Sequence, residues 1–322
     1  SPVLKTKMSK IIHISQNKRS LGNSGGVEKF ATYLDQALGV TIYSSDDYKA
    51  GCRPEELNKH LISKGMVTKD DLVVTDGYWN LGLPDEIRTI PVCHGTYAAN
   101  YLKESCNVFN ELIIGFRKSV KDQRKAFSKI NSTPVSVSES ARRELRKFYD
   151  IDSKVILNGV DCDLYRPSEK DLTHKPIILH AATNAKKGKH LMGGLQELLP
   201  DFQIEFLEAK IGEEPDKFKR GDMFLHLATN EGNSYACLEA MSTGLPCLLT
   251  NVGLFEDFPI DNHFVKLIDY KKRDNIAFVA NEIKSFWKKR LNYYPRKWIM
   301  ENASLEIFKK NWQNFIKQVQ NS

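Results

Sequence analysis

The sequence has few of the features that mark membrane-spanning or disulfide-rich proteins. None of its apolar runs approaches the roughly 18 residues that span a bilayer, which argues against a transmembrane helix. Its 322 residues include only six cysteines, with no C-x-x-C pair. Such sparse cysteines are typical of reduced thiols in a cytosolic protein rather than of a zinc site or a disulfide framework. The first ten residues also lack the apolar segment of a signal peptide. We therefore expect a cytoplasmic protein.

The remaining composition is that of a soluble globular protein, with 41% hydrophobic and 27% charged residues. A chain of this length is expected to form about two domains. The net charge of +7 is concentrated in two segments, 117–129 and 271–310. Each basic segment has two interpretations: a solvated helix face, or a surface for an anionic partner.

Short apolar runs alternate with longer helical patterns along most of the chain, which predicts an α/β doubly wound architecture. Several runs are continuously apolar, as in parallel strands that are covered on both faces. Strands are expected at Lys10–Ile14, Leu72–Thr75, Thr89–Cys93, Leu112–Gly115, Pro134–Ser138, Val155–Leu157, Ile177–His180, Gln203–Leu207, Met223–Leu227 and Pro246–Thr250. Helices are expected at Val27–Leu38, Glu55–Lys64, Ser138–Tyr149, Lys187–Leu198 and Tyr235–Thr243, and the chain after Lys271 is expected to be helical.

This many strands requires two sheets, and the polar stretch around 165–175 predicts the boundary between them. We therefore expect one Rossmann-like domain at 1–168 and a second at 169–304.

A glycine-rich segment, Leu21–Glu28, follows the first expected strand and opens a helix. Gly25 and Gly26 would let the backbone approach a phosphate closely, and the helix N-terminus would offer free N–H groups. The segment does not match G-x-G-x-x-G, so an ordinary strand–helix turn is the alternative.

A second segment, around Glu231, indicates a ligand-binding site more strongly. Glu231 lies in a loop after an expected strand, where open α/β sheets bind their ligands. Gly232 permits close backbone approach, and Asn233 or Ser234 could cap the following helix. Glu239 sits in an otherwise apolar stretch of that helix, so its carboxylate would need a partner if it is buried. An ordinary exposed position is the alternative for Glu239.

The spacing Glu231-x7-Glu239 resembles that of retaining GT-B glycosyltransferases of the family 4 type. Three further segments resemble that family in the same order along the chain: Ser24–Glu28, Ser138–Arg142 and Leu157–Pro167. Ala185–Leu191 resembles its phosphate-binding lysine loop. The resemblance covers roughly residues 10 to 255. It implies the GT-B fold, in which a cleft separates two Rossmann-like domains, and a last helix at about 305–322 that packs back on the first domain.

The resemblance also implies roles for individual residues. Glu231 would contact the donor sugar, Lys187 would neutralise the diphosphate, and Glu239 would bind the nucleotide ribose. His94 would lie beside the reacting sugar, although a packed or capping histidine is the alternative. These residues imply a catalytic set of Glu231, His94 and Lys187.

The donor would also meet backbone groups. By the same resemblance, Gly25 and Gly26 would close over the diphosphate from the first domain. Gly232, Asn233 and Ser234 would bring backbone N–H groups to the phosphates.

The sequence departs from the family at two places. The arginine that often precedes the lysine is absent, and Ala182-Thr183 stands there instead. Lys186, Lys189 or a distant arginine would have to compensate. The second departure is a short second domain, which leaves the base pocket, expected at Leu207–Gly212, poorly defined.

Asp161-Cys162-Asp163 is a D-x-D string of the kind that holds a divalent metal in other glycosyltransferases. It lies in the interdomain segment after Asn158-Gly159, so a turn and capping role is favoured over a metal site. We expect no metal and no cofactor.

The expected activity is retaining, metal-independent transfer of a hexosyl group from a UDP-sugar, with a GDP-sugar as the second option. The acceptor would be a glycan, a lipid-linked glycan or another anionic molecule. The apolar and basic helical pattern at 116–130 could contact such an acceptor or make the protein peripheral at the inner membrane surface. Two alternatives stay open: a nucleotide-sugar epimerase of the same fold, and a nucleic-acid-directed glycosyltransferase or binding protein.

Overall fold

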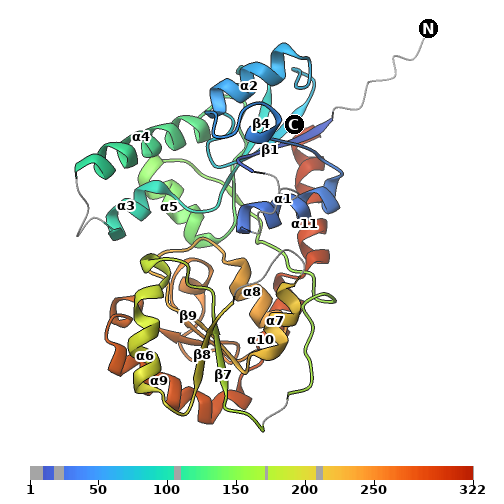
Figure 1. Cartoon of the computed structure of the whole chain (residues 1–322). Coiled ribbons are helices and arrows are strands. Elements are labelled where there is room, and N and C mark those ends of the chain that lie inside the picture. The colour runs from blue at the N-terminus through green and yellow to red at the C-terminus, as the bar shows by residue number, and fades with distance from the viewer. Residues whose placement is uncertain (1–9, 18–24, 105–109, 171–172, 208–212, 322) are drawn as a thin grey trace.

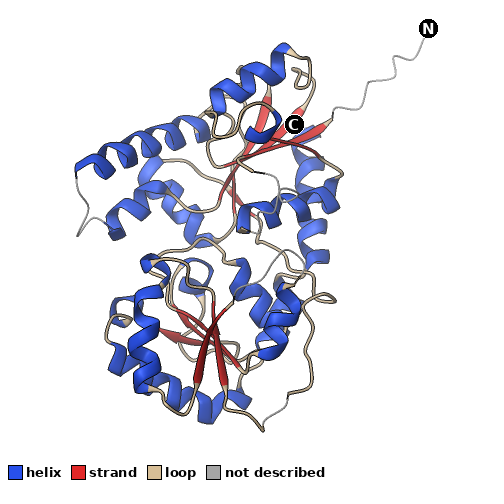
Figure 2. Cartoon of the chain, viewed as in Figure 1, coloured by secondary structure: helices blue, strands red, loops and turns tan. Residues whose placement is uncertain are grey.

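The strands of this chain form two separate parallel sheets, each flanked by helices (Figures 1 and 2). The computed structural model describes residues 10–17, 25–104, 110–170, 173–207 and 213–321. The first part contains β1 Ile11–Ser15, α1 Gly26–Leu38, β2 Thr41–Ser44, α2 Pro54–Ser63, β3 Leu72–Asp76, β4 Arg88–Cys93, α3 Tyr97–Glu104, α4 Asn110–Phe127, β5 Val135–Ser136, α5 Glu139–Tyr149 and β6 Lys154–Val155. The second contains β7 Ile177–His180, α6 Met192–Leu198, β8 Gln203–Phe206, α7 Glu214–Arg220, β9 Met223–His226, α8 Tyr235–Ser242, β10 Cys247–Thr250, β11 Lys266–Ile268, α9 Ile276–Lys289, α10 Pro295–Asn302 and α11 Leu305–Asn321.

The first sheet has the strand order β2-β1-β3-β4-β5-β6, and all its pairs are parallel. Its central strands are buried along their length; β3, for example, has five buried residues in a row. Helices cover both faces, which explains why these strands read as continuous rather than alternating apolar runs.

The second sheet has the order β11-β10-β9-β7-β8 and is also parallel throughout. Strands β7, β9 and β10 are fully buried, and β8 forms a more exposed edge. Together the two sheets confirm the expected α/β, doubly wound GT-B fold.

Several details differ from the expectation. Leu112–Gly115 is part of α4 and not a strand. A short apolar run does not distinguish a strand from a buried helix segment, and here it continues into a helical pattern. β2, β11 and α7 were not expected, because they are short. The helix expected from Lys187 begins only at Met192, because Gly188 has a left-handed backbone with φ of 85° and separates two 3-10 turns.

The C-terminal helix α11 packs on the first domain, beside α1 (Figure 1). Its apolar face carries Phe308, Trp312 and Phe315, which are buried in the same cluster as Phe30 of α1. Gln313 fixes the position further, because its side-chain amide donates to the carbonyl of Ala37 at 3.0 Å. The chain therefore crosses from the second domain back to the first.

We expect Trp312→Ala to lower the free energy of unfolding by about 3–5 kcal/mol, because it removes a large side chain with no exposed area. Urea denaturation would measure the change. The exposed Lys317 on the same helix supplies the control, since Lys317→Ala should change stability by less than about 0.5 kcal/mol. Equal effects of the two changes would contradict this account of the packing.

Candidate functional site

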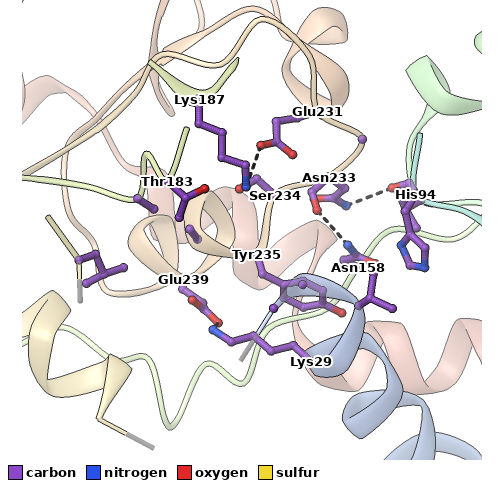
Figure 3. Close-up of a pocket in the computed structure, with 18 of the residues that line it drawn as sticks. Lys29, His94, Asn158, Thr183, Lys187, Glu231, Asn233, Ser234, Tyr235 and Glu239 are labelled. Atoms are coloured by element: carbon purple, nitrogen blue, oxygen red, sulfur yellow. Dashed lines mark hydrogen bonds and ion pairs between the residues drawn. The ribbon is translucent and has the colours of Figure 1, made fainter. Parts of the chain in front are cut away.

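The carboxyl ends of the strands in both sheets face one cavity. In the first sheet the strand order reverses between β1 and β3, and in the second it reverses between β7 and β9. Open α/β sheets bind ligands outside the carboxyl ends of strands at such points. The loops that follow these strands line a cavity of about 450 Å³, a typical size for a ligand site. Residues of both domains line this interdomain cavity: Gly25, Gly26, Lys29, His94, Asn158, Thr183, Lys187, Glu214, Glu231–Tyr235 and Glu239 among them (Figure 3).

Glu231 and Lys187 meet on the second-domain side of the cavity. The Nζ of Lys187 lies 3.3 Å from Oε1 of Glu231, and Nε2 of the buried His226 lies 3.4 Å from the same oxygen. Burial alone would raise the pKa of Glu231, but His226 and Lys187 outweigh it and lower that pKa to about 2. Glu231 is therefore ionised at neutral pH and stands beside a lysine ammonium.

Gly232 lies directly against the first domain. A Cβ at this position would overlap the carbonyl oxygen of His94, so no other residue fits without displacing one domain from the other. The loop is fixed from behind, because the backbone N–H of Leu254 donates to the carbonyl of Gly232 at 2.9 Å. This close approach brings Glu231 and His94, from different domains, into the lining of one cavity.

Asn233 fastens the same loop to the first domain. Its side-chain amide donates to the carbonyl of Val137 at 3.1 Å, and the amide of Asn158 donates to the carbonyl of Asn233 at 2.9 Å (Figure 3). Ser234 is the N-cap of α8, without a side-chain capping bond. The amino end of α8 therefore lies at the cavity, where its backbone N–H groups suit an anion.

His94 is joined to a buried carboxylate. The Nε2–H of His94 donates to Oδ1 of Asp76 at 2.9 Å, and Nε2 of the fully buried His13 lies 3.2 Å from Oδ2. Burial alone would raise the pKa of Asp76, but the two histidines outweigh it and hold that pKa well below its ordinary value. Asp76 thus stays ionised and orients the ring of His94, which also packs edge-on against Phe30.

Glu239 is buried and paired with a lysine from the other domain. Lys29 of α1 donates to Oε1 of Glu239, and its Nζ lies 3.7 Å from Oε1 of Glu214 on α7 (Figure 3). Glu239 is only 1% exposed, and burial outweighs the nearby Lys29, so the pKa of Glu239 is raised above its ordinary value. The partner that a buried carboxylate needs therefore comes from the first domain.

The position of the absent arginine is occupied by Thr183, which lines the cavity. Lys186 points instead to the first domain, where its Nζ donates to Oδ1 of Asn100 at 2.7 Å. Arg273 is buried, and its guanidinium donates to the carbonyls of Ala185, Lys186 and Leu227. Arg273 therefore holds the lysine loop in shape. Among the described residues that line the cavity, the two lysines are Lys29 and Lys187, and no arginine lines it.

Asp161 forms a turn. Its carboxylate accepts hydrogen bonds from the backbone N–H groups of Asp163 and Leu164 at 3.0 and 2.9 Å. Within the described ranges, no group of three or more His, Cys, Asp or Glu side chains is placed to hold a metal ion.

The basic pattern at 116–130 lies on α4 of the first domain. Lys121, Arg124 and Lys125 are exposed, and Phe127 is buried on the opposite face. The helical pattern was expected to reach residue 130, but α4 ends at Phe127, and Ile130 is 84% exposed. No helix in the described part of the chain is both long and apolar enough to cross a bilayer.

Sequence reasoning missed Asp76, His226, Lys29 and Glu214. Asp76 ends an apolar strand, and that signal could have identified it. Lys29 and Glu214 had no comparable signal, because each acquires its role only where the two domains meet. Of the expected segments, 21–24 and 208–212 lie outside the described residues, whereas Gly25, Gly26 and Leu207 line the cavity.

We expect Gly232→Ala to separate the two domains, because the added methyl group overlaps the His94 carbonyl oxygen. Small-angle scattering should show an increased radius of gyration. Gly193→Ala on α6 is the matched control, since its Cβ would have no atom within 4 Å. An unchanged radius of gyration in both variants would contradict this prediction, because it would show that the loop moves aside without separating the domains.

We expect Asp76→Asn to lower the free energy of unfolding by roughly 1–3 kcal/mol at pH 7, because it removes a charged hydrogen bond to His94. Since the folded-state pKa is depressed, the stabilisation is present above the ordinary carboxyl pKa of about 4 and is lost as pH falls further. Urea denaturation of both proteins between pH 7 and pH 3 would test this. A difference that grows on acidification would contradict it.

Comparison with known proteins supports the fold. No family model matches the sequence, and no curated protein matches it. Among solved structures, sucrose-phosphate synthase from Thermosynechococcus elongatus is 11% identical, with a TM-score of 0.74 over 97% of this chain and 99% of that one. HepE from Anabaena, solved with UDP and glucose, is 13% identical, with a TM-score of 0.70 over 96% and 99%. A glycosyltransferase from Rickettsia africae is 16% identical, with a TM-score of 0.66 over 98% and 99%. The chain therefore has the fold of these glycosyltransferases over nearly its whole described length.

Proposed function

We propose that this protein is a retaining glycosyltransferase that moves a hexosyl group from a nucleotide sugar to an acceptor hydroxyl. The observation that carries the proposal is the interdomain cavity. An ionised carboxylate and an ammonium, Glu231 and Lys187, line it together with His94, which is hydrogen-bonded to Asp76. The similarity in fold to glycosyltransferases supports the same activity.

The second domain would bind the donor. The Lys187 ammonium and the amino end of α8 would meet the negative charge of the diphosphate as it leaves. These groups supply positive charge without a metal ion, so we propose metal-independent transfer. The carboxylate of Glu231 would hold the donor sugar through its hydroxyl groups, because an ionised carboxylate only accepts hydrogen bonds.

The nucleotide would extend toward Glu239. Its ribose hydroxyls could donate to this carboxylate, which Lys29 already keeps in place. The structure of HepE with UDP and glucose supports a UDP-sugar as the donor. The uracil would lie near Leu207 at the end of the cavity.

The first domain would present the acceptor. The donor C1–O bond breaks, and the diphosphate leaves with the bonding electron pair. The acceptor oxygen forms the new bond on the same face of the sugar, and its proton passes to a diphosphate oxygen. His94, oriented by Asp76, would hold the reacting sugar in place so that little motion separates bound reactants from the transition state.

We expect Glu231→Gln to lower kcat by about 100-fold and to change the Kd of UDP little, because its contacts strengthen as the sugar becomes cationic. Glu239→Gln should instead weaken UDP binding by roughly 1–3 kcal/mol, the value of a charged hydrogen bond. Hydrolysis of UDP-, GDP- and ADP-glucose would report turnover, and calorimetry would report nucleotide affinity. The exposed Glu301 provides the control, since Glu301→Gln should alter neither.

Three outcomes would contradict the proposal. The first is that the wild-type protein binds none of the nucleotides. The second is that it converts a nucleotide sugar to its epimer without transfer, as an epimerase would. Complete loss of activity with EDTA, restored by manganese, would refute metal-independent transfer.

A further inference from the structure

A second cavity opens from the first on the side of the N-terminal sheet. It has a volume of about 250 Å³ and shares Val27, His94, Glu231 and Gly232 with the interdomain cavity. Its outer wall is aromatic and contains Tyr78, Trp79 and Tyr97. A molecule in this second cavity would therefore lie beside both Glu231 and His94.

A third cavity continues in the same direction. Its volume is about 340 Å³, and it shares Gln16, Tyr78 and Trp79 with the second. The third cavity lies between the start of α2 and the face of α4 that carries Lys118, Ser119 and Asp122. The three cavities thus adjoin one another in series from the second domain to the far side of Trp79.

The wall between the second and third cavities is held rigidly. Asn58 of α2 is fully buried, and its side-chain amide donates to the carbonyls of Trp79 and Leu81 at 2.8 and 2.7 Å. Asn80 donates to the carbonyl of Ala126 on α4 at 2.8 Å. Because helices on both sides fix this segment, the half-buried Tyr78 and the small exposed part of the otherwise buried Trp79 offer a preformed binding surface.

The polar groups of the third cavity are balanced in charge. Two basic residues, Arg53 and Lys118, line it together with two acidic ones, Glu55 and Asp122. Arg53 is already engaged, with Nη2 lying 3.2 Å from Oε1 of Glu55. With equal numbers of positive and negative side chains, this lining suits uncharged hydroxyl groups better than it suits an anion.

The exposed basic residues of α4 do not form this cavity. Of the basic residues described on that helix, Lys118 lines it, whereas Arg117, Lys121, Arg124 and Lys125 lie elsewhere on the exposed surface. Most of the positive charge that suggested an anionic acceptor is therefore separate from the path that leads to Glu231.

We propose that the second and third cavities form one acceptor groove for an uncharged glycan of at least two sugar units. The sugar that is extended would occupy the second cavity beside His94, and the next unit would pass Trp79 into the third. Aromatic faces would cover the apolar faces of the sugars, and Glu55 and Asp122 would accept hydrogen bonds from hydroxyl groups. The proposal rests on the proposed glycosyl transfer and specifies its acceptor.

The test fills the third cavity and leaves the other two unchanged. Ser119→Trp places a large side chain in the third cavity, and Lys121→Trp places the same side chain on the exposed face of the same helix. The acceptors are methyl glucoside and methyl galactoside, each compared with its disaccharide counterparts, the methyl maltoside, cellobioside and lactoside. The donor is the nucleotide sugar that the wild-type protein hydrolyses, and saturation-transfer NMR with UDP measures acceptor binding separately from turnover.

In the wild-type protein and in Lys121→Trp, we expect at least one disaccharide to have a KM about tenfold or more below that of its monosaccharide. Ser119→Trp should abolish this difference while leaving donor hydrolysis and the monosaccharide KM unchanged. Glu55→Gln, which keeps the side-chain shape, should raise the disaccharide KM about fivefold and provides a second test if Ser119→Trp does not fold. Transfer should not weaken between 50 and 300 mM salt.

Three other results would contradict the proposed acceptor groove. These are equal KM values for one- and two-unit acceptors in the wild-type protein, equal behaviour of Ser119→Trp and Lys121→Trp, or transfer only to glucuronide or phosphorylated sugars. Failure of the wild-type protein to hydrolyse any nucleotide sugar would instead count against the proposed function. The two failures are thus distinguished by donor hydrolysis.

Discussion

The contact between Gly232 and the carbonyl of His94 is the constraint on which the rest of the site depends. It brings a loop at the carboxyl edge of the second sheet against a loop at the carboxyl edge of the first, at a distance that only a glycine allows. Two hydrogen bonds stabilise this contact. The side chain of Asn233 donates to the carbonyl of Val137, and the backbone N–H of Leu254 donates to the carbonyl of Gly232. Because both sheets are parallel, the loops that follow their strands lie at the edges that this contact joins.

Each buried acidic group in the cleft is compensated from a different part of the chain. Glu231 meets Lys187 and His226, Glu239 meets Lys29, and Asp76 lies between two histidines. An isolated buried charge is costly, so these pairs hold each acidic side chain in position. The Lys29–Glu239 pair joins the domains at the point where the nucleotide would bind. The contact between the domains and the position of the Glu239 side chain are therefore physically linked.

The two sides of the cleft differ in character. On the second-domain side, Lys187 and the amino end of α8 suit an anion. Beyond His94 the walls become aromatic, and the third cavity carries equal numbers of acidic and basic residues. The charge that stands out in the sequence at 117–129 lies mostly outside this path. A count of charged residues along the chain therefore indicates how charged the protein surface is. The charge inside the cleft depends instead on which side chains line it.

The sequence by itself determined the strand–helix alternation, the two sheets, and the loops that carry Glu231, Lys187 and His94. These features depend on local patterns: apolar runs, glycines after strands, and a carboxylate within an apolar helix. It misassigned Leu112–Gly115 and missed β2 and β11, because short apolar runs carry no clear period. Tertiary structure alone decided which groups meet across the cleft. Lys29 reaches Glu239 from 210 positions away in the chain, and Arg273 shapes the lysine loop through backbone carbonyls that are alike in every residue. Such contacts leave no local signal, because they form only when two separately folded domains come together.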